Sequence, residues 1–148
     1  MNEMLGNQYF MARNYMEAAN VFQEVLKEEP DNVNAKKKLI ISYVQIGKYA
    51  KSLDLFLDVI KNDTGIITST DLEKDDCPCV ELVNDIEDKT KYNIQSFTTL
   101  QILGILWLYC DIHKSIEYFE AAFKEKPTDE NTSLILNILK KKLTEISN

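Results

Sequence analysis

Three cysteines and a single histidine are the residues of this chain whose types favour zinc. Cys77, Cys79, Cys110 and His113 together supply three thiols and one imidazole, which is the ligand count of a structural zinc site. Only one residue separates the first two cysteines, however, where zinc sites usually have about two to four. We therefore predict no metal and no cofactor. A disulfide between Cys77 and Cys79 is not expected either, because so short a loop strains the bond. A metal or redox regulator built on these cysteines stays an alternative.

No arrangement of side chains for catalysis accompanies these residues. His113 lies at a predicted turn, and no serine or cysteine motif surrounds it. The acidic run of Asp71, Glu73, Asp75 and Asp76 approaches the spacing of a calcium loop, but the glycine and the closing glutamate of such a loop are missing. A glycine-rich phosphate loop and a zinc-protease motif are also absent from the sequence. The sequence therefore predicts a protein that is not an enzyme.

A repeat accounts for most of the chain. The segment 5–30 recurs as 39–64 and again, one residue shorter, as 103–127. Each copy has the apolar spacing of two short helices joined by a turn. A repeat of about 34 residues is typical of a helical solenoid, whose units bury their apolar faces by stacking on one another. The sequence thus predicts a single all-α solenoid domain with three helical hairpins, at about 1–30, 32–62 and 97–126.

Small residues mark the places where the two helices of a hairpin approach each other. Gly6 opposite Ala18, and Gly104 opposite Ser115, would allow close packing of antiparallel helices. Ile40 takes the position of the glycine in the second copy, so that hairpin is predicted to be splayed or shifted in register. The first helix is predicted to begin almost at the first residue, without a polar cap before it.

This pattern resembles the tetratricopeptide repeat family over about 1–64 and 97–127. The resemblance rests on six residues of the first copy and their counterparts in the others, namely Leu5, Gly6, Tyr9, Ala18, Phe22 and Pro30. It implies that the first helix of each hairpin lines a concave groove in which a partner lies. The positions that the resemblance turns toward the groove are Asn7, Phe10, Met11, Lys37, Ile41, Val44, Gln45, Gln101, Ile105, Leu108 and Tyr109.

The same resemblance argues against one known mode of binding. Members of the family that grip the C-terminal carboxylate of chaperones use a Lys–Asn pair and a further Asn, followed by Lys and Arg. Asn7 is kept here, but Glu3 stands in place of the lysine and Lys38 in place of the second asparagine. We therefore expect a non-enzymatic adaptor or scaffold that binds an apolar or amphipathic peptide segment. The alternative is a self-associating structural subunit whose groove is filled by its own insertion or by a second copy.

The insertion 63–95 and the C-terminal segment do not repeat. The insertion is rich in acidic residues, and its apolar residues after Pro78 have the spacing of a short amphipathic helix. It is either a mobile acidic loop, or else a degenerate hairpin or a lid over the groove. After the third hairpin, Thr128 or Asp129 is a good N-cap for a helix at about 129–146 that closes the free end of the solenoid.

The overall charge limits the classes of partner. A net charge of −7 makes nucleic acid and anionic lipid poor partners, so we expect a protein or peptide partner, with a homodimer as a further possibility. The longest near-apolar run, 102–110, is about half the length that a membrane span needs, so no membrane insertion is expected. An odd number of cysteines and the lack of a signal segment favour a cytoplasmic location.

Overall fold

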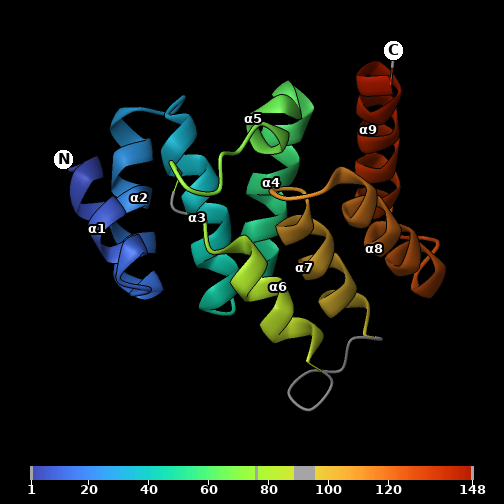
Figure 1. Cartoon of the computed structure of the whole chain (residues 1–148), viewed down its shortest axis with the longest axis horizontal. Coiled ribbons are helices and arrows are strands. Elements are labelled where there is room, and N and C mark those ends of the chain that lie inside the picture. Colours follow the sequence, from blue (N-terminus) through green and yellow to red (C-terminus); the bar gives the residue numbers. More distant parts are fainter. Residues whose placement is uncertain (1, 76, 89–95, 148) are drawn as a thin grey trace. The chain divides into compact units, whose positions relative to one another are not determined.

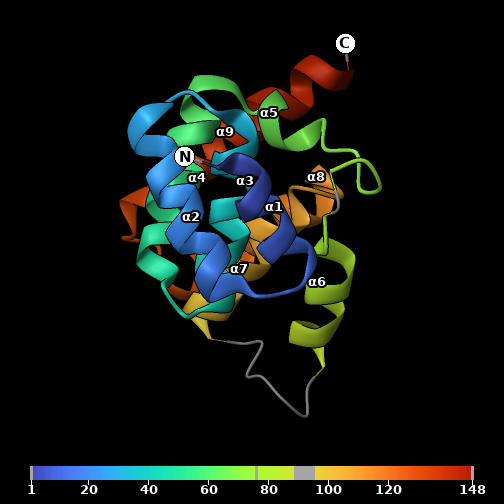
Figure 2. The same ribbon diagram turned by 90° about the vertical axis from the view of Figure 1, so that its left-hand side faces the viewer.

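The computed structural model describes residues 2–75, 77–88 and 96–147, and the regular structure of these residues is helical. Figure 1 shows the helices in chain order, and Figure 2 shows the same ribbon turned by 90° about the vertical axis. They are α1 (Glu3–Met11), α2 (Tyr15–Glu28), α3 (Val33–Gln45), α4 (Tyr49–Asp63), α5 (Gly65–Thr68), α6 (Cys79–Glu87), α7 (Phe97–Trp107), α8 (Ile112–Glu125) and α9 (Glu130–Ser147). The predicted all-α fold class is confirmed. Within the described residues, the helices are too short or too polar to cross a membrane.

The chain divides into two compact units, Met1–Val59 and Ile60–Asn148, with the boundary inside α4. In the first unit α1 packs on α2 and α2 packs on α3. In the second unit α7 packs on α6 and α8, and α8 packs on α9. A single repeat domain over the whole chain stays a prediction.

Polar caps and turns set the ends of the helices. The side-chain oxygen of Asn2 accepts a hydrogen bond from the backbone N–H of Leu5 at 3.1 Å, so α1 does have a polar cap. The expectation of an uncapped first helix is wrong because α1 begins at Glu3, which leaves Asn2 outside it as the cap. Between α3 and α4 the chain turns at Gly47, whose φ of 81° lies in the left-handed region that glycine adopts without strain.

An aromatic ring lies directly on the glycine of the first and third hairpins. A Cβ at Gly6 would lie 2.7 Å from the ring of Phe22, and one at Gly104 would lie 2.6 Å from the ring of Phe119. The side chain nearest to a Cβ at Gly6 is thus that of Phe22, and the pairing of Gly6 with Ala18 stays a prediction. Ser115 does face Gly104, since its hydroxyl donates to the Gly104 carbonyl oxygen at 2.6 Å. These glycines are needed because the rings occupy the space of a side chain.

The second hairpin keeps the register of the third. The hydroxyl of Ser52 donates to the carbonyl oxygen of Ile40 at 2.9 Å, which is the counterpart of the Ser115–Gly104 bond. A shifted register is therefore wrong for this hairpin. Ser52 is small and fully buried, so α4 comes close enough to bond the backbone of α3 even though Ile40 carries a side chain.

Part of the acidic insertion forms a helix that packs within the second unit. Helix α6 packs against α7, and its Leu82 and Val83 are buried. The reading of the insertion as a structureless loop is thus wrong for α6, because these apolar residues gain burial on α7. Residues 89–95 of the insertion lie outside the described residues.

The C-terminal helix α9 begins as the sequence predicts. Asp129 is its cap, because a carboxylate oxygen of Asp129 accepts from the backbone N–H of Thr132 at 2.9 Å. The helix buries Ile135, Leu136 and Leu139 and packs on α8.

Candidate functional site

Most of the apolar residues that were predicted to line a groove on the first unit are buried. Phe10, Ile41 and Val44 belong to the core of the structure, whereas Met11 and Gln45 are exposed. Of the other polar residues of the set, Asn7 and Lys37 are half-buried. An open apolar strip made of Phe10, Ile41 and Val44 is therefore not present on the surface, and partner contacts at these positions stay a prediction.

The predicted groove residues of the second unit are also buried. Gln101 joins α7 to α9, since its amide Nε2 donates to the hydroxyl of Thr132 at 3.2 Å. Ile105, Leu108 and Tyr109 are at most 3% exposed. Burial raises the pKa of the Tyr109 hydroxyl far above its usual range, as expected of a phenol without access to water.

Asn7 takes part in a polar network that connects α1 to α3. Its side-chain oxygen accepts hydrogen bonds from Asn34 Nδ2 and Lys38 Nζ, each at 3.0 Å. Glu3 accepts from Asn34 Nδ2 at 2.7 Å and from Asn32 Nδ2 at 2.6 Å. The Lys38 ammonium also lies 5.4 Å from the centre of the Phe10 ring, close enough for a cation–π contact. Within the first unit these side chains thus join two helices, and Asn7 already has two donors.

A groove of about 430 Å³ lies elsewhere on the first unit, between α2, α3 and α4. Its walls combine an apolar floor with a polar rim. The apolar residues are Leu26, Leu39, Tyr43 and Leu55, and the polar ones are Gln23, Lys51, Asp54 and Asp58.

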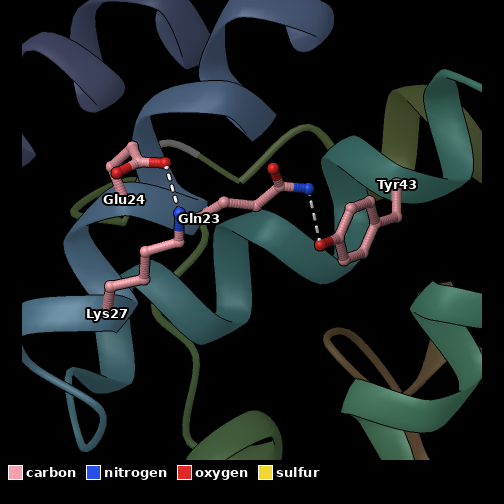
Figure 3. Close-up of polar contacts among 4 residues, drawn as sticks. All are labelled: Gln23, Glu24, Lys27 and Tyr43. Carbon is pink, nitrogen blue, oxygen red and sulfur yellow. Dashed lines mark hydrogen bonds and ion pairs between the residues drawn. The ribbon is translucent and has the colours of Figure 1, made fainter.

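A hydrogen bond joins α2 and α3 through two residues that line this groove. Gln23 reaches from α2 and donates from Nε2 to the hydroxyl of Tyr43 on α3 at 2.8 Å (Figure 3). From α4, the Lys51 ammonium lies 5.9 Å from the centre of the Tyr43 ring. The ion pair of Glu24 with Lys27, also drawn in Figure 3, is 2.9 Å long, and neither residue lines the groove. The floor is therefore fixed by contacts from both flanking helices.

A comparison with protein families matches residues 9–65 to the tetratricopeptide repeat family. The predicted resemblance to this family is therefore confirmed. A comparison with curated proteins found no match. The all-helical structure is consistent with a tetratricopeptide-like α-solenoid, and such repeats generally mediate protein–protein interactions and are generally non-enzymatic.

Every residue that lines the groove falls inside the part of the chain that matches the tetratricopeptide repeat. Sequence reasoning missed the groove because it considered only the first helix of each hairpin, and two of the three walls here come from second helices. One signal was present: Tyr43 is a large side chain with a polar end, and such a residue usually finds a hydrogen-bond partner when it is buried.

The four candidate metal ligands are not brought together. Cys77 and Cys79 are joined as a disulfide, so the expectation against this bond is wrong. Their Cα atoms lie 5.4 Å apart, and with both sulfur atoms in this bond neither is available to a metal. Cys110 is a half-buried free thiol whose pKa is raised by burial and then by the charge of Asp111, and His113 is exposed. Within the described residues, no three cysteine, histidine or acidic side chains form a group that could hold a metal.

Proposed function

We propose that this chain is a non-enzymatic protein-interaction module, and that it binds an amphipathic helix of a partner protein in the groove between α2, α3 and α4. The observation that carries the proposal is an apolar floor with a charged rim inside the residues that match a tetratricopeptide repeat. We propose this groove, and not the groove that the family resemblance implies, because Phe10, Ile41 and Val44 of the latter are buried.

The chemistry of the groove specifies what the partner helix must carry. Leu26 and Leu55 are half-buried, so a partner can still remove part of their apolar surface from water. Two or three apolar residues at helical spacing on the partner would cover this floor. Asp54 on the rim favours basic residues at the edge of the partner helix, as does the net charge of −7. The expected ligand is therefore a basic amphipathic helix.

A labelled peptide tests this proposal. The probe is an acetylated, amidated helical peptide with leucines at i, i+3, i+4 and i+7 and lysines beside them, and its control is a scrambled peptide of the same composition. Because a fully buried leucine contributes about 1.5–3 kcal/mol and Leu55 is already half-covered, Leu55→Ala removes about 1 kcal/mol, or roughly fivefold in affinity. Glu24→Gln, on the same unit but outside the groove, leaves the affinity unchanged. Fluorescence anisotropy measures both.

Two results would contradict the proposal. One is equal binding of the scrambled and the amphipathic peptide. The other is a Leu55→Ala variant that keeps the helical circular dichroism of the parent and also its full affinity. Sedimentation of the same proteins tests the alternative: a stable dimer that Leu55→Ala dissociates would mean that a second copy of the chain occupies the groove.

A further inference from the structure

A second pocket, of about 440 Å³, lies in the second unit between the end of α4 and the C-terminal half of α9. Its lining residues are Ile60, Lys61, Asn62, Asp63 and Thr64 from the first segment and Ile138, Lys141, Lys142 and Glu145 from α9. The two isoleucines give the pocket an apolar wall, and most of the other residues are polar or charged. Neither the motifs nor the repeat positions of the chain indicate this pocket.

The charge of this pocket is opposite to that of the chain. Three lysines face two carboxylates here, whereas the whole chain carries a net charge of −7. Among the described residues, no carboxylate lies within ion-pair distance of Lys61, Lys141 or Lys142. Of the two carboxylates, Asp63 already accepts a hydrogen bond from the backbone N–H of Gly65 at 2.9 Å. The pocket therefore has an excess of positive charge, with three lysines against two carboxylates.

A favourable interaction with a helix end explains the position of only one of the three lysines. Lys61 lies in the last turn of α4, where a cation interacts favourably with the unbonded carbonyl groups of the helix end. Lys141 and Lys142 come from a different helix and stand before its last turn. The Nζ atom of Lys142 lies 3.6 Å from the point that a Cβ on Gly65 would occupy, so it points toward the α4 end and not away into solvent.

We propose that this pocket binds an acidic peptide segment of a partner protein. Carboxylates of the segment contact Lys61, Lys141 and Lys142, and one apolar side chain of the segment lies on Ile138. Charge-assisted hydrogen bonds from ammonium groups to carboxylates are stronger than neutral ones, and the apolar wall favours a peptide over a small inorganic anion. This site is independent of the groove on the first unit and takes a ligand of the opposite charge.

The test uses two peptides, three lysine variants of the full chain and Leu55→Ala. The probe is a fluorescein-labelled, acetylated and amidated peptide with the core Glu-Leu-Glu-Glu, and its control has glutamine in place of each glutamate. Lys141→Gln and Lys142→Gln are each expected to weaken binding of the acidic peptide about two- to fivefold, the range of a solvent-screened ion pair. Lys140→Gln is the matched control, because Lys140 is adjacent on α9, lies 3.8 Å from Glu120 and does not line the pocket.

The outcomes distinguish specific binding in the pocket from a general electrostatic attraction between the peptide and the protein. Binding that falls with salt, is absent for the glutamine peptide and survives Lys140→Gln supports the proposal. An equal loss in all three lysine variants, or equal binding of the glutamine peptide, overturns it. Full displacement of the acidic peptide by inorganic phosphate at low millimolar concentration also overturns it, since the pocket would then be a site for simple anions. Leu55→Ala leaves binding of the acidic peptide unchanged, so failure here is distinguishable from failure of the groove on the first unit.

Discussion

Replacing Gly104 with alanine places a methyl group between α7 and α8. The added Cβ would lie 2.6, 2.7 and 2.9 Å from three ring carbons of Phe119, whereas carbon atoms in contact prefer about 3.5–4.0 Å. Phe119 is fully buried, so its ring has little room to move. The helices must therefore separate or the ring must leave its preferred rotamer.

Two opposing effects set the size of the change. Adding a methyl group to a filled core costs about 1–3 kcal/mol, whereas alanine is more favourable than glycine inside a helix by about 1 kcal/mol. Gly104→Ala should thus lower the free energy of unfolding by about 0–2 kcal/mol. In a Phe119→Leu background the ring is gone, and the same change should raise the free energy of unfolding by up to about 1 kcal/mol. The two backgrounds therefore differ in the sign of the effect.

Thermal unfolding followed by circular dichroism measures all four proteins of this cycle. A change of 1 kcal/mol corresponds to about 2–4 °C in Tm for a chain of this size. Gly6→Ala with Phe22→Leu is an independent repeat on the first unit, where the Cβ would lie 2.7 Å from the ring. If Gly104→Ala raises Tm in the parent, or shifts Tm equally in both backgrounds, the ring does not limit the approach of the two helices.

Two further predictions concern the second unit. Glu87 joins α6 to α7 and α8, because its carboxylate accepts hydrogen bonds from Trp107 Nε1 at 3.3 Å and from the hydroxyl of Tyr118. Glu87→Ala should therefore red-shift the fluorescence emission of Trp107 and speed proteolysis within 77–88. Unchanged emission would mean that α6 is held without these bonds. Burial raises the pKa of Tyr109, so the folded state holds this proton more tightly than the unfolded state, whose tyrosine pKa is about 10. Stability should therefore be intact below about pH 10 and fall as the pH rises above it, and urea unfolding at pH 9 and 11 should show a smaller fall for Tyr109→Phe.

The helices could be predicted from the sequence because the signals for them are local. Apolar spacing of about 3.6 residues defines the helices, and single residues define where they begin and end. Asn14 caps α2, Gly47 takes the left-handed conformation before α4, and Asp111 accepts two backbone hydrogen bonds at the start of α8. None of these features depends on a distant part of the chain.

The binding surface could not be predicted in the same way because burial depends on distant contacts. Helix α7 is apolar on nearly all its sides, so its sequence does not tell which side faces a partner and which side faces α6, α8 or α9. The bond of Gln101 to Thr132 joins residues 31 positions apart, and that of Gln23 to Tyr43 joins residues 20 apart. The lysine pocket likewise combines the end of α4 with α9. Each of these sites exists only once the helices have packed.

The departures from the carboxylate-binding pattern of the tetratricopeptide family have a structural role in this chain. At two positions where that pattern needs a lysine and an asparagine, the chain has Glu3 and Lys38, and both are partnered within the first unit. Lys38 is only 8% exposed and bonds Asn7, so a ligand carboxylate would have to displace an internal partner to reach it. Glu3 would in addition repel the same carboxylate. On the α1–α3 face these residues thus form a link between two helices. The lysines of the second-unit pocket lie elsewhere in the chain, at the end of α4 and on α9.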